Sequence, residues 1–298
     1  MKLEKLIKRF RIDDPDHFRL ASFDAADTGG LDFDKDEARA VLAEDLNRLS
    51  DLQERLYAED RWALLIVLQA MDAAGKDGVI KHVMTGLNPQ GCLVHAFKAP
   101  SASELDHDFL WRAAQYLPAR GKIGIFNRSH YEDVLVVRVH QELLERQRIP
   151  KGLIGKDIWK QRFKSIRAFE RHLAHNGTIV LKFFLHVSKE EQRRRFLDRL
   201  EQPAKRWKFS MDDVAERKLW TKYMAAYADM IQATSRPHAP WYVVPADNKP
   251  FARLIVAKAM IEALDGLDLK FPRIDPAALK EMEKVRKALL AEDQGGKS

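Results

Sequence analysis

The sequence QAMDAAGKDG (residues 69–78) directly follows the apolar run RWALLIVL (61–68), and together they indicate the architecture of the chain. The run is too short and too uniformly apolar for a surface helix, which predicts a strand buried on both faces. The ten residues after it depart twice from the phosphate-loop pattern G-x-x-x-x-G-K-[ST]. Ala70 stands in place of the first glycine, and Asp77 in place of the metal-binding hydroxyl. The segment is therefore either a rewired phosphate loop or an ordinary turn from a strand into a helix.

Strands and helices alternate on both sides of this segment. Apolar runs predict strands at 62–70, 92–97, 122–127, 178–187 and 241–246. Apolar residues at helical spacing predict helices at 36–60, 79–84, 101–116, 156–175, 188–201, 211–233 and 249–264. The alternation predicts an α/β fold in which helices cover both faces of a parallel sheet. Ligands of such sheets bind at the carboxyl ends of the strands.

One compact domain is expected, with a shorter segment at each end of it. Residues 1–35 show little periodicity and predict an irregular N-terminal leader, whereas residues 271–298 predict a charged C-terminal tail. The domain spans 36–270. Within it, Pro203 interrupts the chain after a basic helix, which predicts a helical excursion at about 203–233 that can act as a lid.

The composition is that of a soluble, charge-rich protein, with 46% apolar and 32% charged residues. No apolar stretch approaches the ~18 residues that span a membrane, and the N-terminus lacks the apolar core of a signal peptide. The single cysteine, Cys92, excludes an internal disulfide and predicts a reducing cytoplasm. The net charge of +7 indicates polyanionic partners, which could be nucleic acid, phosphates or an acidic surface.

The loop itself carries groups that suit phosphate. A glycine-rich turn between a strand and a helix directs backbone N–H groups to one place, where Lys76 adds a positive charge. Asp72 would repel phosphate on its own, so it makes sense mainly as a Mg²⁺ ligand; Asp77 is a rival whose ordinary role is helix capping. In the ordinary alternative, the glycines only shape a turn and Lys76 is solvated. The predicted phosphate-binding residues of the loop are Ala73, Ala74, Gly75, Lys76, Asp77 and Gly78.

A second polar cluster, FNRSHYED (126–133), follows the third predicted strand. Arg128 falls at the carboxyl end of that strand, where a guanidinium can bind phosphate oxygens in a forked geometry. Glu132 and Asp133 come within a turn of it and could complete a metal or base cluster with the loop carboxylate. His130 has no partner at metal-ligand spacing, so we expect it to serve in packing or as polar support. The alternative is an ordinary loop of polar surface residues.

The basic segment KEEQRRRFLDRLEQPAKRWKF (189–209) is the third candidate. In a helix, Arg195 and Arg199 fall on one side. A cluster of three further cations surrounds Trp207: Lys205, Arg206 and Lys208. The arrangement suits a lid that clamps polyphosphate; it would equally suit a single-stranded nucleic acid, although no recognisable nucleic-acid motif accompanies it.

These motifs together resemble the polyphosphate kinase 2 family over residues 35–268: DAAGKDG (72–78), FNRSHYEDV (126–134), the helix with the paired arginines and PAKRWKFS (203–210). The resemblance implies a three-layer P-loop kinase fold with a helical lid. It implies Mg²⁺-dependent transfer of a phosphoryl group between inorganic polyphosphate and the nucleotides AMP, ADP and ATP, with Mn²⁺ as an alternative metal. It also implies a homodimer or homotetramer that binds no nucleic acid and no membrane.

By position, the resemblance gives each motif a role. Asp72 would hold Mg²⁺, Lys76 would contact phosphate, and Arg128 would contact the transferred phosphates. Asn127 replaces the usual Walker B aspartate, and the resemblance therefore leaves the second metal ligand to Asp133 or Glu132. The FNRSHYED form resembles the subgroup that uses AMP as well as ADP. The polyphosphate channel and lid would be lined by Arg195, Arg199, Lys205 and Lys208.

Two other classes of function fit the same residues. One is an ATP-dependent small-molecule kinase on the same fold, and the other is a polyanion or nucleic-acid binding protein whose P-loop is vestigial. Substrate assays separate these two classes from a polyphosphate kinase, because only a polyphosphate kinase transfers phosphate between polyphosphate and a nucleotide.

Overall fold

The computed structural model describes residues 3–30 and 35–295, and a parallel sheet runs through its centre. The five strands lie in the order β2-β3-β1-β4-β5, and every neighbouring pair is parallel. All five predicted strands are confirmed to within one residue at either end. Their bounds are β1 Ala63–Gln69, β2 Cys92–Ala96, β3 Ile123–Asn127, β4 Thr178–His186 and β5 Trp241–Pro245.

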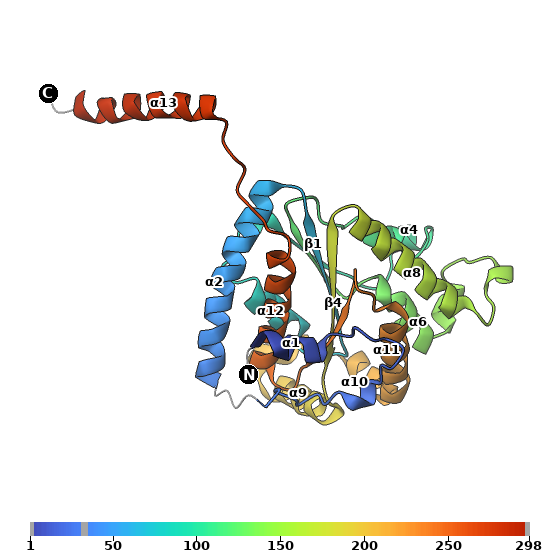
Figure 1. The fold of residues 1–298 in the computed structure, drawn as a ribbon. Coiled ribbons are helices and arrows are strands. Elements are labelled where there is room, and N and C mark those ends of the chain that lie inside the picture. Colours follow the sequence, from blue (N-terminus) through green and yellow to red (C-terminus); the bar gives the residue numbers. More distant parts are fainter. Residues whose placement is uncertain (1–2, 31–34, 296–298) are drawn as a thin grey trace.

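Helices cover both faces of the sheet, as predicted. In Figure 1, α2 and α12 lie on one side of the strands and α8 and α11 on the other, which gives three layers. The longer helices are α1 Leu3–Phe10, α2 Lys35–Glu59, α3 Lys76–Val83, α8 Ile158–His175, α9 Lys189–Glu201, α10 Met211–Lys218, α11 Trp220–Thr234, α12 Lys249–Asp265 and α13 Pro276–Gly295. The shorter ones are α4 Ala102–Leu105, α5 Trp111–Ala114, α6 Val136–Val139, α7 Glu142–Glu145, and the 3-10 helices η1 Leu20–Ser22, η2 Pro89–Gly91, η3 His130–Val134, η4 Lys151–Leu153 and η5 Pro203–Lys208.

The register of the sheet brings the three candidate motifs together. All seven residues of β1 are buried, so this strand lies in the core between β3 and β4. Leu68 pairs with Asn127 of β3, and Gln69 pairs with Phe184 of β4. The carboxyl ends of the three strands are therefore level, and the loops that follow them meet at one edge of the sheet.

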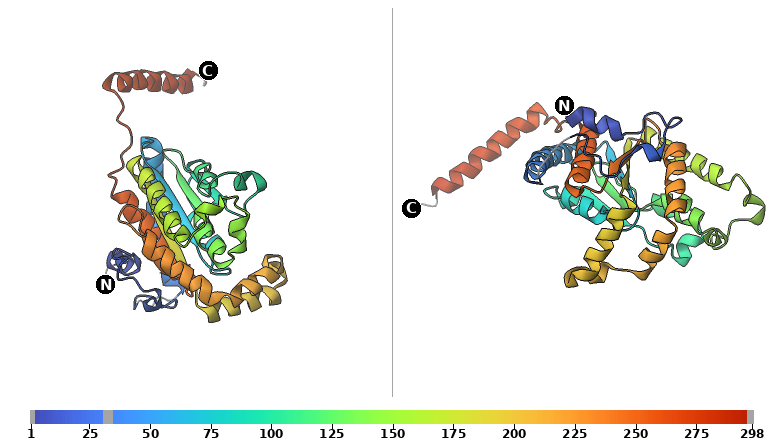
Figure 2. Two further views of the ribbon diagram at one scale, coloured as in Figure 1. Left: turned by 90° about the vertical axis from the view of Figure 1, so that its right-hand side faces the viewer. Right: turned by 90° about the horizontal axis from the view of Figure 1, so that it is seen from below.

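Two predicted helices are each divided in the structure. The one expected at 101–116 forms only α4 and α5, because the Asp108 carboxylate accepts the N–H of Leu110 (2.9 Å) and starts a new turn. The one expected at 211–233 divides at Leu219 into α10 and α11. The α11 residues Tyr227 and Met230 are buried in the body, so α11 is not part of the projecting lid; η5 and α10 form the lid beyond the end of α9, in yellow and gold in Figure 2.

The two ends of the chain are more ordered than the sequence suggests. The leader, expected to be irregular, contains α1 and then runs along the outer edge of β5, where the Ile12 N–H donates to the Trp241 carbonyl (2.8 Å). The expected tail forms α13, which stands clear of the body in both figures and exposes Leu279, Val285 and Leu289. The parts of these predictions at 1–2, 31–34 and 296–298 lie outside the described residues. Within the described ranges, no helix has the length and apolar character that a membrane span requires.

Candidate active site

The loop between β1 and α3 forms one wall of a cavity of about 480 Å³. Ala73 (φ 61°) and Gly75 (φ 114°) lie in the left-handed region, which glycine adopts most readily. Ala70 does not, which is why alanine can replace the first glycine of the usual pattern. The loop residues that line the cavity are Asp72, Ala73, Ala74, Gly75, Lys76, Asp77 and Gly78.

Lys76, the first residue of α3, directs its amine back into the loop. Its Nζ donates to the carbonyl of Ala70 at 3.0 Å. Burial, followed by the positive charge of Arg128, lowers the pKa of Lys76 to about 8. Because a bound phosphate would favour the protonated amine, phosphate binding should raise that pKa.

The affinity for a phosphate chain is therefore expected to fall above pH 8. Below that pH the Lys76 amine is protonated with or without ligand, so it adds no pH dependence. Above it, the free protein must take up a proton to bind, and the dissociation constant should rise by up to about tenfold per pH unit. Calorimetric titration with tripolyphosphate from pH 7 to 9.5 measures this rise. Lys76→Met is the control, because the ligand's own titration remains in it; equal slopes for both proteins would contradict the assignment.

Arg128 lies beside the loop, in an unusual backbone conformation. Its φ of 63° is uncommon for a residue with a side chain and is typical of functional sites. Its Nη2 lies 2.6 Å from Oδ1 of Asp72, and its Nη1 lies 3.6 Å from Oε2 of Glu132. The Glu132 carboxylate first, and Asp72 after it, raise the pKa of Arg128, so the guanidinium stays charged.

Buried side chains hold this cluster in place. With its amide oriented to satisfy both ends, Gln69 donates to Oε1 of Glu132 (2.8 Å) and accepts from Oγ of Ser129 (3.0 Å). Behind it, the Tyr131 hydroxyl donates to Glu170 (2.6 Å), which also pairs with Lys182 (2.6 Å). The active cluster is thus anchored to β1 and β4 through polar groups that are themselves paired.

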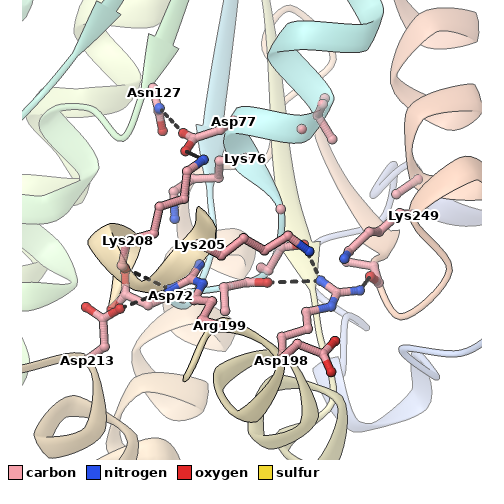
Figure 3. Close-up of a pocket in the computed structure, with 18 of the residues that line it drawn as sticks. Asp72, Lys76, Asp77, Asn127, Asp198, Arg199, Lys205, Lys208, Asp213 and Lys249 are labelled. Carbon is pink, nitrogen blue, oxygen red and sulfur yellow. Dashed lines mark hydrogen bonds and ion pairs between the residues drawn. The ribbon is translucent and has the colours of Figure 1, made fainter. Parts of the chain in front are cut away.

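The end of α9 and the lid contribute cations to the same cavity. Nη1 of Arg199 lies 3.3 Å from Oδ2 of Asp213, and Nζ of Lys208 lies 3.7 Å from Oδ2 of Asp77. In Figure 3, Lys205 and Lys208 of the lid segment and Lys249 of α12 reach into one space beside the loop. The cavity is therefore basic, and several of its cations are already paired with acids that a polyanion would replace.

A second cavity, of about 490 Å³, lies on the other side of Arg128. Its lining is largely apolar and includes Phe97, Leu105, Val136, Val137 and Leu143. Among the described residues, Arg128 alone lines both cavities, and Glu132 lines only the second. One cavity thus suits a chain of negative charges, the other suits a molecule with a flat apolar part, and they meet at a guanidinium.

Comparison with known proteins agrees with this geometry. The profile of the family described as Polyphosphate kinase 2 matches residues 32–272. The chain belongs to that family. Its match covers the sheet, both cavities and the lid, and it confirms the resemblance inferred from the motifs.

Relatives in the polyphosphate kinase 2 family match nearly the whole chain. An ADP-polyphosphate phosphotransferase of Rhodopseudomonas palustris is 52% identical over 86% of this chain and 89% of its own. An AMP/ADP-polyphosphate phosphotransferase of Meiothermus ruber is 46% identical over 92% of this chain and 98% of its own. The crystal structure of polyphosphate kinase 2 from Arthrobacter aurescens TC1 is 40% identical, covers 96% of both chains and has a TM-score of 0.84. The P-loop kinase fold expected for a polyphosphate kinase 2 is therefore confirmed.

Not every basic residue that was expected to bind polyphosphate has its cationic group available in the cavity. Arg199, Lys205 and Lys208 line it. Arg206 does not, because its Nε donates to the carbonyl of Leu200 (2.8 Å) at the end of α9. Arg195 lines the cavity but is only 4% exposed.

Asp133 lies apart from Asp72, which differs from the expectation that both hold the metal. It is 3% exposed and does not line the phosphate cavity. Its Oδ1 accepts from Gln147 at 2.5 Å, and its Oδ2 lies 3.7 Å from Nη2 of Arg112. Burial raises the pKa of Asp133 to about 6. Its partners make it a buried support of the second cavity.

The carboxylates present still fit a magnesium ion. In the described part of the chain, no three His, Cys, Asp or Glu side chains lie close enough together to form an all-protein metal cage. Mg²⁺ at phosphate-transfer sites usually takes one or two carboxylates and completes its shell with water and substrate oxygens. Asp72, with one oxygen on Arg128, provides such a carboxylate in the phosphate cavity.

His130 packs in the interior, which is the first of the two roles expected for it. It is 1% exposed, and its ring lies edge-on to Phe169 at 5.7 Å. Burial lowers its pKa to about 3, so the ring is neutral.

Sequence reasoning missed several residues of the phosphate cavity. Lys249 and Arg253 come from α12, one turn apart, and Asp213 comes from the first turn of α10. Lys249 could have been found, since it follows β5 and the same strand-end rule applies to it. No comparable signal marked Asp213, whose place depends on how the lid folds back.

Proposed function

We propose that this chain transfers a phosphoryl group between inorganic polyphosphate and an adenine nucleotide, AMP or ADP, in either direction. Membership of the polyphosphate kinase 2 family and the names of its close relatives support this reaction. The observation that carries the proposal is the pair of cavities that meet at Arg128. The basic cavity receives the polyphosphate, and the more apolar one receives the nucleoside.

The chain's own residues supply position and positive charge. The loop N–H groups and Lys76 hold the phosphate nearest the reaction, and Arg128 contacts the group being transferred. Lys205, Lys249 and Arg253 continue the positive charge away from the loop along the rest of the chain of phosphates. No general base is required, because the accepting phosphate oxygen is already ionised.

Mg²⁺ is the metal we assign to this reaction. Asp72 would hold it, and the bound ion would neutralise negative charge on the phosphates. We also propose a cytoplasmic homodimer or homotetramer that binds neither nucleic acid nor membranes, which light scattering and binding assays can check.

An acceptor assay tests the function directly. Purified protein with polyphosphate, Mg²⁺ and either AMP or ADP should form ADP or ATP, read by chromatography. Turnover that needs ATP and a metabolite but never uses polyphosphate would identify a small-molecule kinase instead. Tight binding of RNA or DNA without turnover would identify a polyanion-binding protein.

Replacing Glu132 should weaken the use of AMP more than the use of ADP. With a single phosphate at Arg128, AMP brings its nucleoside closer to Glu132 than ADP does. Glu132→Asn is expected to lower kcat/KM about tenfold or more with AMP and about threefold or less with ADP, as for loss of one charged hydrogen bond. Parallel initial-rate assays measure both values, with the exposed α7 variant Glu145→Asn as control. Equal losses on the two acceptors would show that Glu132 does not discriminate between them.

A further inference from the structure

Arg195 has no free hydrogen-bond donor, although its position on α9 suggests a polyphosphate contact. A guanidinium carries five N–H donors in a fixed plane. Nε donates to Oε1 of Glu191 at 2.7 Å, and Nη1 donates to the loop carbonyls of Ala73 (3.0 Å) and Ala74 (2.7 Å). Nη2 donates to the carbonyls of Ala246 (2.5 Å) and Asp247 (3.1 Å) after β5. Binding a phosphate would require Arg195 to release one of these groups.

Gln192, one turn earlier on α9, extends the same contact. It is fully buried, and its Nε2 donates to the carbonyl of Asp72 at 2.9 Å. Its Oε1 accepts from Arg217 of the lid helix α10 at 3.0 Å. Three consecutive loop carbonyls, from Asp72 to Ala74, are therefore held by side chains of α9, and one of these side chains is bonded to the lid.

These hydrogen bonds from α9 determine which backbone groups of the loop face a bound phosphate. In a planar trans peptide, the carbonyl and the following N–H point in opposite directions. Turning the three carbonyls toward α9 removes their negative ends from the anion and directs the N–H groups of Ala73 and Gly75 away from α9, whereas the N–H of Ala74 donates to the carbonyl of Met71 (3.3 Å). It also stabilises the left-handed backbone of Ala73, which would otherwise be strained.

We infer that Arg195 and Gln192 are positioning residues that shape the phosphate loop, and that Arg195 is not a polyphosphate ligand. The inference rests on the proposed function for its kinetic test only. Arg199, four residues further along α9, provides the contrast, because its Nη1 lies on Asp213 in the cavity and can exchange that partner for phosphate.

The matched variants Arg195→Lys and Arg199→Lys separate the two roles, since both keep the charge. An ammonium has three donors and cannot hold five acceptors. Arg195→Lys is therefore expected to lower kcat about 10²-fold, with KM for polyphosphate changed about threefold or less, because a displaced loop misplaces the reacting group. Arg199→Lys should mainly raise KM. The same KM rise in both variants, with kcat retained, would overturn the inference.

Amide hydrogen exchange tests the loop without relying on turnover. The amides of residues 72–76 should exchange about tenfold faster in Arg195→Lys than in the native protein. The amides of β1 in that variant, and the amides of residues 72–76 in Arg199→Lys, should exchange at the native rate. Unchanged exchange at the loop in Arg195→Lys would also overturn the inference.

A second variant covers a failure to fold. If Arg195→Lys does not fold, Gln192→Leu leaves the contacts of Arg195 in place, removes the contact to Asp72 together with the one to Arg217, and should show the same local acceleration of exchange. Unchanged exchange of residues 72–76 in Gln192→Leu would then overturn the inference. A native protein that binds tripolyphosphate but transfers nothing would refute the proposed function and leave these exchange tests valid.

Discussion

Asp72→Asn is expected to lower turnover about 10³-fold or more while leaving the fold intact, as expected for loss of several kcal/mol of charge stabilisation. Asparagine keeps the size of the side chain and removes its charge. Arg128 would keep its second carboxylate, Glu132, so the cluster should stay in place. The loss should therefore fall on the bound phosphates and not on the protein's stability.

Two measurements make this prediction specific to the carboxylate. Rates of ADP and ATP formation give the loss, and thermal melting should show a Tm within a few degrees of the native value. The control Asp212→Asn removes an exposed carboxylate from the same lid helix that carries Asp213 and should leave the rate nearly unchanged. Activity above a tenth of the native rate in Asp72→Asn would refute its proposed role with the metal.

Lys182→Met should destabilise the fold by about 3–5 kcal/mol, the cost of leaving a buried charge without its partner. Lys182 is fully buried in β4, and its three donors reach Glu170 (2.6 Å), the Tyr131 hydroxyl (3.0 Å) and the carbonyl of Thr234 (2.8 Å). Burial lowers the pKa of Lys182 to about 8 and raises that of Glu170, so removal from water already opposes both charges. Chemical denaturation measures the free energy of unfolding.

The triple variant Lys182→Met, Glu170→Leu, Tyr131→Phe is the matched control. It replaces the three side chains of the network by apolar groups of similar volume, so no charge or hydroxyl is left unpaired and only the Thr234 carbonyl loses its donor. It should be more stable than Lys182→Met alone, despite carrying three changes. A triple variant that is less stable would mean that the network stabilises the fold beyond the cost of burying its charges.

The fold could be predicted because four of the five strands are largely buried on both faces, although the edge strand β2 is partly exposed. Such strands are continuous apolar runs, and β1 and β5 show this most clearly. Two helix predictions were wrong in their bounds. At Asp108 a side chain accepts a backbone N–H and interrupts the helix, and at Leu219 the apolar periodicity continues across a break between two helices. The leader's α1 was missed although Leu3, Leu6, Ile7 and Phe10 fall at helical spacing, because these eight residues were interpreted together with the irregular stretch that follows them.

The candidate site was predictable where it depends on strand ends alone. The structure brings Asp72, Lys76 and Arg128 together because β1 and β3 are neighbours that end at the same level. Charge read from the sequence was a poorer guide to role. Arg195 carries the charge of a ligand, but its hydrogen bonds are all taken within the protein, and only the folded contact between α9 and the loop reveals this.

The meeting of the two cavities at Arg128 has a consequence for the order of events. In the proposed reaction, neither substrate lies in the other's path, so each can arrive or depart while the other stays bound. The phosphoryl group can then pass directly from one phosphate chain to the other, without a covalent intermediate on a protein side chain. The same passage serves both directions, so the supply of polyphosphate and nucleotide, and not the enzyme, determines which way phosphate flows.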